Sequence, residues 1–271
     1  MSDIVWNGGS GDGNWNTGGN WVGGTRPANS DVAIIGSTNQ AIIGATVAET
    51  GLTVKVTPGF GGTIGADAPL IFTNGPALIQ YAGTGRYANF GCGGTVTSAK
   101  FEHSGGQEVV LSSGTWTLIS NSSGNLTIAA ATIVTTFNNV AGSVTAGYNA
   151  TAFTTCSNGG MMTASRNATT LNCLRGSYIH LDNGVTTYTA NTTVNIQNGA
   201  TYNKRSGGTD TTVNVFPGST FTIVGTSGGA AGSVTLTTAN IWTGSTFTEN
   251  VPGITLTVTT KNYIGSTTGS R

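Results

Sequence analysis

The chain has 271 residues, 43 of them glycine, and only 7% carry a charge, against about 25% in an ordinary globular domain. Ten basic and ten acidic residues are scattered singly and balance to a formal net charge of zero, so we expect no nucleic-acid-binding surface. Hydrophobic residues make up 37% and fall in short alternating runs, which argues against disorder and predicts a folded, all-β chain.

Residues 1–38 form a Trp- and Gly-rich N-terminal segment, which ends in a first buried strand near residues 31–35. Glycine and asparagine between the tryptophans favour tight turns over helix. The aromatic residues have two interpretations: a cap that covers an open core, or an anchor that docks on another protein. The candidate partner-binding residues are Trp6, Trp15, Trp21 and Arg26.

Met1 is followed by neither a basic stretch nor an apolar one, so we expect no secretory signal. The chain also has no run of about 18 apolar residues, so no transmembrane helix and no membrane partner are expected. These two observations predict a protein made in a cytoplasm.

Residues 39–110 continue in short strands, with prolines and glycines between them. This region is either the irregular first coils of a solenoid, which we favour, or a small β-domain. The expected strands are Ala41–Ile43, Leu52–Val56, Leu70–Phe72, Ala77–Tyr81 and Thr95–Phe101.

The most regular region is residues 111–260, where a turn glycine, a small residue and a β-former recur at intervals of 16 to 28 residues. Between the glycines, Thr or Ser alternates with apolar residues, so that one face of each strand points inward. A recurrence of this size predicts stacked coils. We therefore expect a single elongated β-solenoid of the right-handed parallel β-helix type. The repeat glycines are Gly114, Gly142, Gly160, Gly176, Gly199, Gly218 and Gly244.

Residues 261–271 are expected to form a polar C-terminal tail. A solenoid exposes strand edges at its ends, and such edges pair with other chains unless they are capped. The N-terminal segment offers a cap, but no similar segment occurs near the C-terminus. We therefore expect association into a homotrimer.

The three cysteines are Cys92, Cys156 and Cys173, and an odd number argues against a closed disulfide framework. They are expected to be buried thiols, with a Cys156–Cys173 bridge as the alternative. Since no Cys-x-x-Cys pair occurs, we expect no metal, and nothing in the sequence indicates a cofactor.

The N-terminal pattern contains Trp6, Gly8, Trp15, Asn20-Trp21, Pro27, Asp31, Ala33 and Ile35. It resembles a motif at the start of β-solenoid proteins, found in autotransporter-like adhesin passengers and in bacteriophage virion proteins. Since adhesin passengers need a secretion signal and a membrane barrel, the resemblance favours a virion protein.

The resemblance implies a non-enzymatic bacteriophage capsid decoration or cement protein, made in the host cytoplasm and located in the virion. Its partners would be the major capsid protein and further copies of itself. The alternatives are a tail fibre or spike component, a bacterial surface adhesin passenger, and a polysaccharide-acting β-helix enzyme. Glycan binding would be compatible with the fold, but no residue indicates it.

Few carboxylates are available for an enzyme of that kind, which needs a pair at a defined separation. In the regular coils they are Asp182, Asp210 and Glu249, too widely spaced to indicate a site. His180 precedes Asp182 by two residues, so that Asp182 could orient the imidazole. We interpret this pair as an outward polar pair on a threonine-rich wall, and expect no catalytic residues.

Two other groups of charged or ionisable residues have ordinary interpretations. Lys204-Arg205 is the only adjacent basic pair in the coil region and is expected to lie in a solvated loop. His103 precedes Ser-Gly-Gly and is likewise expected in a loop.

Overall fold

The computed structural model describes residues 1–36, 38–103, 107–149, 151–181, 191–205, 207–224, 233–248 and 254–265. These residues form parallel strands in stacked coils, a β-solenoid of about 10 turns with almost no helix, as the sequence predicts. Within the described residues the only helix is η1 (Gly18–Asn20), so no helix there could cross a membrane. The chain divides into two compact units, Met1–Thr136 with Ala141–Ser143, and Phe137–Val140 with Val144–Arg271.

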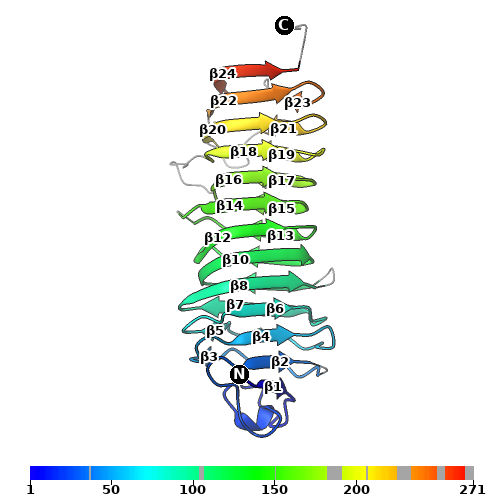
Figure 1. Cartoon of the computed structure of the whole chain (residues 1–271), viewed down its shortest axis with the longest axis vertical. Helices are drawn as coiled ribbons and strands as arrows, with labels where there is room; N and C mark the ends of the chain where they lie inside the picture. The colour runs from blue at the N-terminus through cyan, green and yellow to red at the C-terminus, as the bar shows by residue number, and fades with distance from the viewer. Residues whose placement is uncertain are drawn as a thin grey trace. The chain divides into compact units, whose positions relative to one another are not determined.

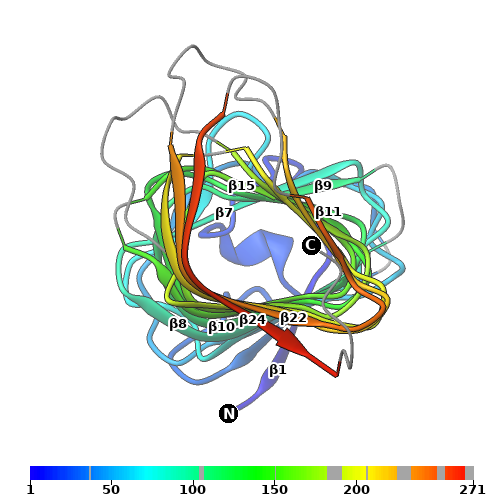
Figure 2. The same cartoon turned by 90° about the horizontal axis from the view of Figure 1, so that it is seen from above.

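The first unit stacks its coils in two parallel sheets, on opposite sides of the interior (Figures 1 and 2). One sheet runs in the order β1 (Asp3–Trp6), β2 (Val32–Ile35), β4 (Thr53–Val56), β6 (Leu78–Tyr81), β8 (Thr95–Glu102) and β10 (Gly114–Ser123). The other runs in the order β3 (Thr46–Val47), β5 (Leu70–Phe72), β7 (Tyr87–Cys92), β9 (Glu108–Leu111) and β11 (Asn125–Ile128). The division into units falls within β12 (Thr132–Asn139) and β13 (Ser143–Ala146).

The second unit repeats the same arrangement. Its first sheet consists of β14 (Phe153–Asn158), β16 (Ala168–Cys173), β18 (Thr193–Ile196), β20 (Gly208–Val215), β22 (Val234–Trp242) and β24 (Leu256–Ile264). Its second sheet contains β15 (Met161–Ala164), β17 (Ser177–His180), β19 (Thr201–Lys204), β21 (Thr220–Ile223) and β23 (Thr246–Phe247). Each strand pairs in parallel with its counterpart in the next coil, for example β16 with β18 and β17 with β19.

The alternation along each strand decides which side chains enter the core. In β18, Val194 and Ile196 are fully buried, whereas Thr193 and Asn195 lie on the outer wall. Threonine suits this wall because its branched side chain favours extended backbone and its hydroxyl stays hydrated. The inward side chains of successive coils stack in register, as in the aromatic column Tyr178, Tyr202, Phe221 and Phe247.

Five of the seven repeat glycines, at 114, 176, 199, 218 and 244, have a positive φ, which confirms that they turn the chain between strands. Gly176 shows why glycine is needed there. Its φ is +68°, and a Cβ at this position would collide with the carbonyl of Gly160 in the preceding coil.

From β4 onward, the described strands between residues 39 and 110 pair with strands on both sides of them in the first unit. β8 pairs with both β6 and β10, and β9 pairs with both β7 and β11. At the other end of the chain, β24 extends to Ile264, beyond the expected start of the tail at 261. Lys261, Asn262 and Tyr263 continue the strand because they pair in register with Ala239, Asn240 and Ile241 of β22.

Candidate functional site

The tryptophans of the N-terminal segment form one buried aromatic cluster. Trp21 lies at its centre, with ring centroids 5.1 Å from Trp6 and 4.8 Å from Trp15, both edge to face. Trp15 also meets Phe72 of β5 edge to face, at 5.9 Å. All three indoles are at most 2% exposed, so their surface is already used in joining the segment to the first coils.

The same segment covers the outer edge of β1. Val22 N donates to Val5 O at 2.8 Å, Asn7 N donates to Asn20 O at 2.8 Å, and Trp6 and Trp21 form an antiparallel bridge. These bonds satisfy backbone groups that would otherwise be open to another chain. The segment lies beside β1 at the end of the first coils, as its dark blue trace shows (Figure 1). It therefore covers this edge of the sheet, and we call the segment the cap.

Two aspartates stabilise the turns of this cap. Asp12 accepts bonds from Asn14 N at 3.0 Å and from Thr17 Oγ1 at 2.7 Å, and these bonds, the backbone one foremost, lower its pKa. Asp31 accepts from Ala28 N at 3.0 Å and from the main chain of residue 2 at 2.7 Å, and these two bonds lower its pKa as well. Both carboxylates thus bond to the folded cap in their charged form.

Arg26, the fourth candidate partner-binding residue, forms an ion pair with Glu49. Its side chain is 42% exposed, whereas Glu49 is 8% exposed. A partner that approaches the folded cap would therefore contact Arg26 and the exposed Val22 rather than the indole rings.

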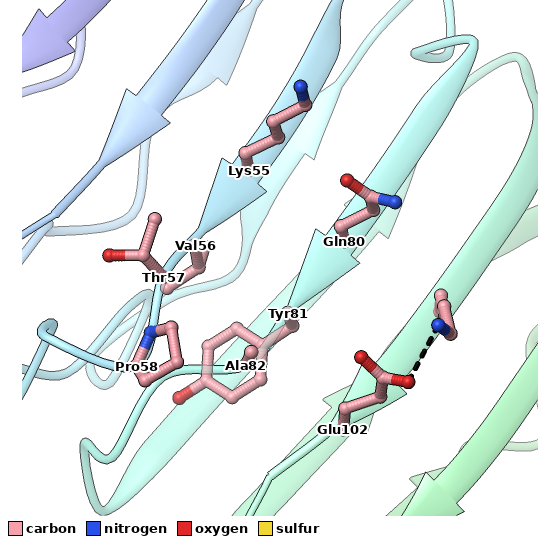
Figure 3. A pocket seen from close by; sticks show the side chains of 9 residues that line it. Lys55, Val56, Thr57, Pro58, Gln80, Tyr81, Ala82 and Glu102 are labelled. Atoms are coloured by element: carbon pink, nitrogen blue, oxygen red, sulfur yellow. Dashed lines mark ion pairs between the residues drawn. The ribbon is translucent and has the colours of Figure 1, made fainter.

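A shallow hollow of about 220 Å³ lies over β4, β6 and β8 (Figure 3). Lys55, Gln80 and Lys100 stand in register along it, one from each strand. Lys100 Nζ lies 2.6 Å from Glu102 Oε1, and both side chains are about half exposed. The floor includes Tyr81, whose pKa burial raises to about 12. This surface could bind a small polar ligand only weakly, because the hollow is shallow and open.

The last described strand, β24, contains no buried residue. β24 and β23 are the last strands of their sheets, and no described strand pairs beyond them. Tyr263 is 62% exposed and Ile264 is 37% exposed, although Ile241, which pairs with Tyr263 from β22, is 6% exposed. Lys261 occupies a position at which the preceding coils bury Val213 and Ala239.

The interior of the second unit contains a buried polar cluster: His180, Asn191, Tyr202, Lys204 and Asp210, each at most 2% exposed. It interrupts two inward-facing columns, one on each sheet. In one column, Asp210 pairs with Leu236 of the next coil. In the other, His180 and Lys204 lie between Ala164 and Ile223. Polar residues thus replace apolar ones at facing positions, which indicates a specific requirement at these positions.

Asp210 is the centre of this cluster. Its Oδ1 lies 3.1 Å from Lys204 Nζ and accepts from Asn191 Nδ2 at 3.0 Å and Asn191 N at 3.3 Å. Its Oδ2 accepts from Tyr202 Oη at 3.3 Å. A buried charge is tolerated when it is paired and fully hydrogen-bonded, and Asp210 has partners on both oxygens.

Two further contacts complete the cluster. Asn191 Oδ1 accepts from the backbone N–H of Ala168 at 2.8 Å, and His180 Nδ1 lies 3.2 Å from Tyr202 Oη. Burial, followed by the nearby Lys204, lowers the pKa of His180 to about 3, so its imidazole is neutral at physiological pH.

The structure corrects two expectations of the sequence analysis here. His180 does not lie on the outer wall, because the alternation of β17 points Tyr178 and His180 inward together. Lys204 does not lie in a solvated loop, because it is the last residue of β19 and reaches Asp210 inside the coil. Asp182 and Glu249 lie outside the described residues. Asp210 contacts Lys204 and Tyr202, and Tyr202 in turn contacts His180.

His103 and the cysteines have structural positions. His103 follows β8 outside a strand, as expected, but it is 1% exposed and its ring packs 5.8 Å from Tyr81. The three cysteines are free, buried thiols, and burial raises the pKa of Cys156 and of Cys173. Across the described ranges, no three His, Cys, Asp or Glu side chains gather as a metal site would require.

Sequence reasoning missed a row of asparagines on the outer wall. From the second asparagine of the row onward, each carboxamide Nδ2 donates to the Oδ1 of the asparagine in the preceding coil, at 2.7 to 2.9 Å. The signal was present as a repeated Thr-Thr-x-Asn, which brings every Asn to the same outward position of its coil. The row consists of Asn172, Asn195, Asn214, Asn240 and Asn262.

Comparison of the chain with protein-family models, with curated proteins and with solved structures finds no match, so its candidate sites are interpreted from their geometry alone.

Proposed function

We propose that this chain is a non-enzymatic structural protein of a bacteriophage virion, which binds the assembled capsid shell as a decoration protein. The observation that carries the proposal is the apolar surface that Tyr263 and Ile264 expose on β24, beside an edge with which no described strand pairs. Surface of this kind is typical of sites that another protein covers.

The position of the ionisable groups supports a structural role. Lys204, Asp210 and His180 form a cluster of charged or titratable side chains, and all three are closed inside the coil. A soluble substrate would have to open the coil to reach them. The outer wall of the same strands carries mainly threonine and asparagine, as in Thr201 and Asn203 of β19.

The proposal moves the shell contact from the tryptophans to the C-terminal end, because Trp6, Trp15 and Trp21 are buried within the cap. A protein that binds only the assembled shell stabilises that shell by mass action. A homotrimer would place three C-terminal ends against neighbouring capsid subunits, and the trimer is part of the proposal.

Light scattering of the purified chain at micromolar concentration measures its oligomeric state directly.

The experiment compares how well the unmodified chain and its variants bind to virions, which are purified from lysates of bacteria that carry the gene for this chain. The double variant Tyr263→Ser with Ile264→Ser removes the apolar end and is expected to lose most of its occupancy in co-sedimentation. Met161→Ser is the matched control, because Met161 of β15 is 64% exposed but lies on the side wall. It is expected to bind like the unmodified chain.

Two results would contradict the proposal at different levels. Equal occupancy of the double variant and the unmodified chain would show that the C-terminal end is not the contact. Absence of the chain from purified virions by mass spectrometry would reject the virion role itself.

A further inference from the structure

The buried cluster of the second unit brings an amine and a carboxamide onto one carboxylate oxygen. Lys204 Nζ lies 3.1 Å from Asp210 Oδ1, and Asn191 Nδ2 donates to the same oxygen at 3.0 Å. The nucleophile and the acyl group thus contact the same proton carrier, Asp210. Reactants held in this way gain a large effective concentration, because their orientation is fixed before reaction.

We propose that Lys204 and Asn191 form an intramolecular isopeptide bond, with Asp210 as the proton carrier. This inference goes beyond the proposed virion function and does not depend on it. The modification site is the interior of the coil, and both reactants are side chains of the same chain.

The first step is proton transfer from the Lys204 ammonium to the Asp210 carboxylate, which leaves a neutral amine. The amine nitrogen then attacks Cγ of Asn191, and negative charge develops on Asn191 Oδ1. The backbone N–H of Ala168 already donates to this oxygen at 2.8 Å, so it stabilises that charge without rearrangement.

In the second step the bond between Cγ and Nδ2 of Asn191 breaks. Asp210 returns its proton to the departing nitrogen, since that nitrogen is its hydrogen-bond donor before the reaction. The new amide keeps one hydrogen on Nζ, and the other two leave with the ammonia as an ammonium ion. Atoms and charge balance, and neither an oxidant nor a cofactor is needed.

The surroundings favour this outcome over hydrolysis. Asn191, Tyr202 and Asp210 are 0% exposed and Lys204 is 1% exposed, so the site excludes bulk water. Tyr202 is a positioning residue, because its hydroxyl donates to Asp210 Oδ2 at 3.3 Å and accepts from Asn191 Nδ2 at 3.2 Å. The bond would tie the two sheets of the second unit together across the interior.

Intact-mass spectrometry of the denatured full chain tests the proposal without any variant. We expect a mass about 17 Da below that of the sequence, the mass of one ammonia, after allowance for removal of Met1. An unmodified mass would overturn the proposal.

Tryptic mapping identifies the linked residues, because acylation blocks cleavage after Lys204. Asn191 and Lys204 both lie between the cleavage sites Arg175 and Arg205. The linked chain therefore gives one peptide, residues 176–205, lighter by about 17 Da and without backbone fragments between residues 191 and 204. A loss of about 18 Da, with residues 206–261 attached to Lys204, would assign the acyl group to Asp210 and overturn the role of Asn191.

Three variants separate this bond from a succinimide at Asn198-Gly199, which has the same mass loss and lies in the same peptide. Lys204→Arg removes the nucleophile and is expected to restore the full mass, whereas persistence of the loss would overturn the proposal. Asn191→Asp is expected to change the loss from about 17 to about 18 Da, because water then leaves in place of ammonia. Lys100→Arg, a change on the exposed wall, is the control and is expected to keep the loss.

Discussion

The N-terminal end of the first unit and the C-terminal end of the second unit solve the same problem in different ways. At the first, three tryptophans and the backbone of residues 20–22 cover the core and the edge of β1. At the second, β24 ends its sheet with Tyr263 exposed and with Lys261 at a position that is apolar in earlier coils. A charged residue on an edge strand discourages uncontrolled pairing without closing the end. The two ends thus differ in their side chains: the cap buries its aromatic residues, whereas β24, which we call the open end, exposes Tyr263.

The largest expected effect comes from removing the centre of the cap. Trp21→Ala should lower the free energy of unfolding by about 3–5 kcal/mol, since Trp21 packs on both Trp6 and Trp15 and leaves a cavity when truncated. Tyr263→Ala at the open end should change it by less than about 0.5 kcal/mol. Urea unfolding of the two variants measures both values, and similar losses would contradict the distinction between the ends.

An intermediate effect is expected in the asparagine row. Asn214 donates to Asn195 at 2.8 Å and accepts from Asn240 at 2.7 Å, so Asn214→Ala should cost about 1 kcal/mol. Asn262 makes a single bond of the row, to Asn240, and is exposed, so Asn262→Ala should cost under about 0.5 kcal/mol. Equal values from urea unfolding would mean that the interior of the row contributes no more than its end.

The smallest effect is a pH dependence confined to the cap. Hydrogen bonds lower the pKa of Asp12 and of Asp31 in the folded state, so both carboxylates stabilise the cap above their ordinary pKa of about 3.8. This contribution is lost as the pH falls through the lowered values, because protonation removes the acceptors. The protection of residues 1–31 against hydrogen exchange, relative to the intrinsic rate, should therefore fall below about pH 4.

The open end provides the internal control for this measurement. β24 contains no carboxylate, so its exchange should not change over the same pH interval beyond the intrinsic chemical rate. In the double variant Asp12→Asn with Asp31→Asn, the cap should lose its pH dependence. An undiminished dependence in that variant would show that other groups are responsible.

Much of the fold could be predicted from the sequence, because the coil repeats its local rules. Glycines such as Gly199 and Gly218 mark the turns, and alternation such as Thr193–Ile196 sets the inward face. The predicted strand Leu70–Phe72 is found with the same bounds. The expected strand Ala41–Ile43 is reduced to a bridge at Ile42, where Gly44 brings the backbone close to Ala68.

The candidate site could not be predicted, because it depends on which residues of different coils face one another. Lys204 and Asp210 are six residues apart but lie on opposite sheets, and Asn191 pairs with Asp210 only once the coils stack. A solvated position is the ordinary expectation for Lys204, since charged residues are rarely buried. The alternation Tyr202-Asn203-Lys204 already placed Lys204 on the same face as Tyr202.

The asparagine row also has a direction. Each of the four bonds is donated toward the preceding coil, so the side-chain dipoles of the four donors point the same way and reinforce one another. Their sum is a small electric polarity fixed along the stack, comparable in origin to that of a helix. Its negative pole is the side-chain carbonyl of Asn262. This oxygen favours an approaching ammonium, guanidinium or amide hydrogen over a carboxylate. A chain of zero net charge thereby gains a preference for a positively charged neighbour at this end.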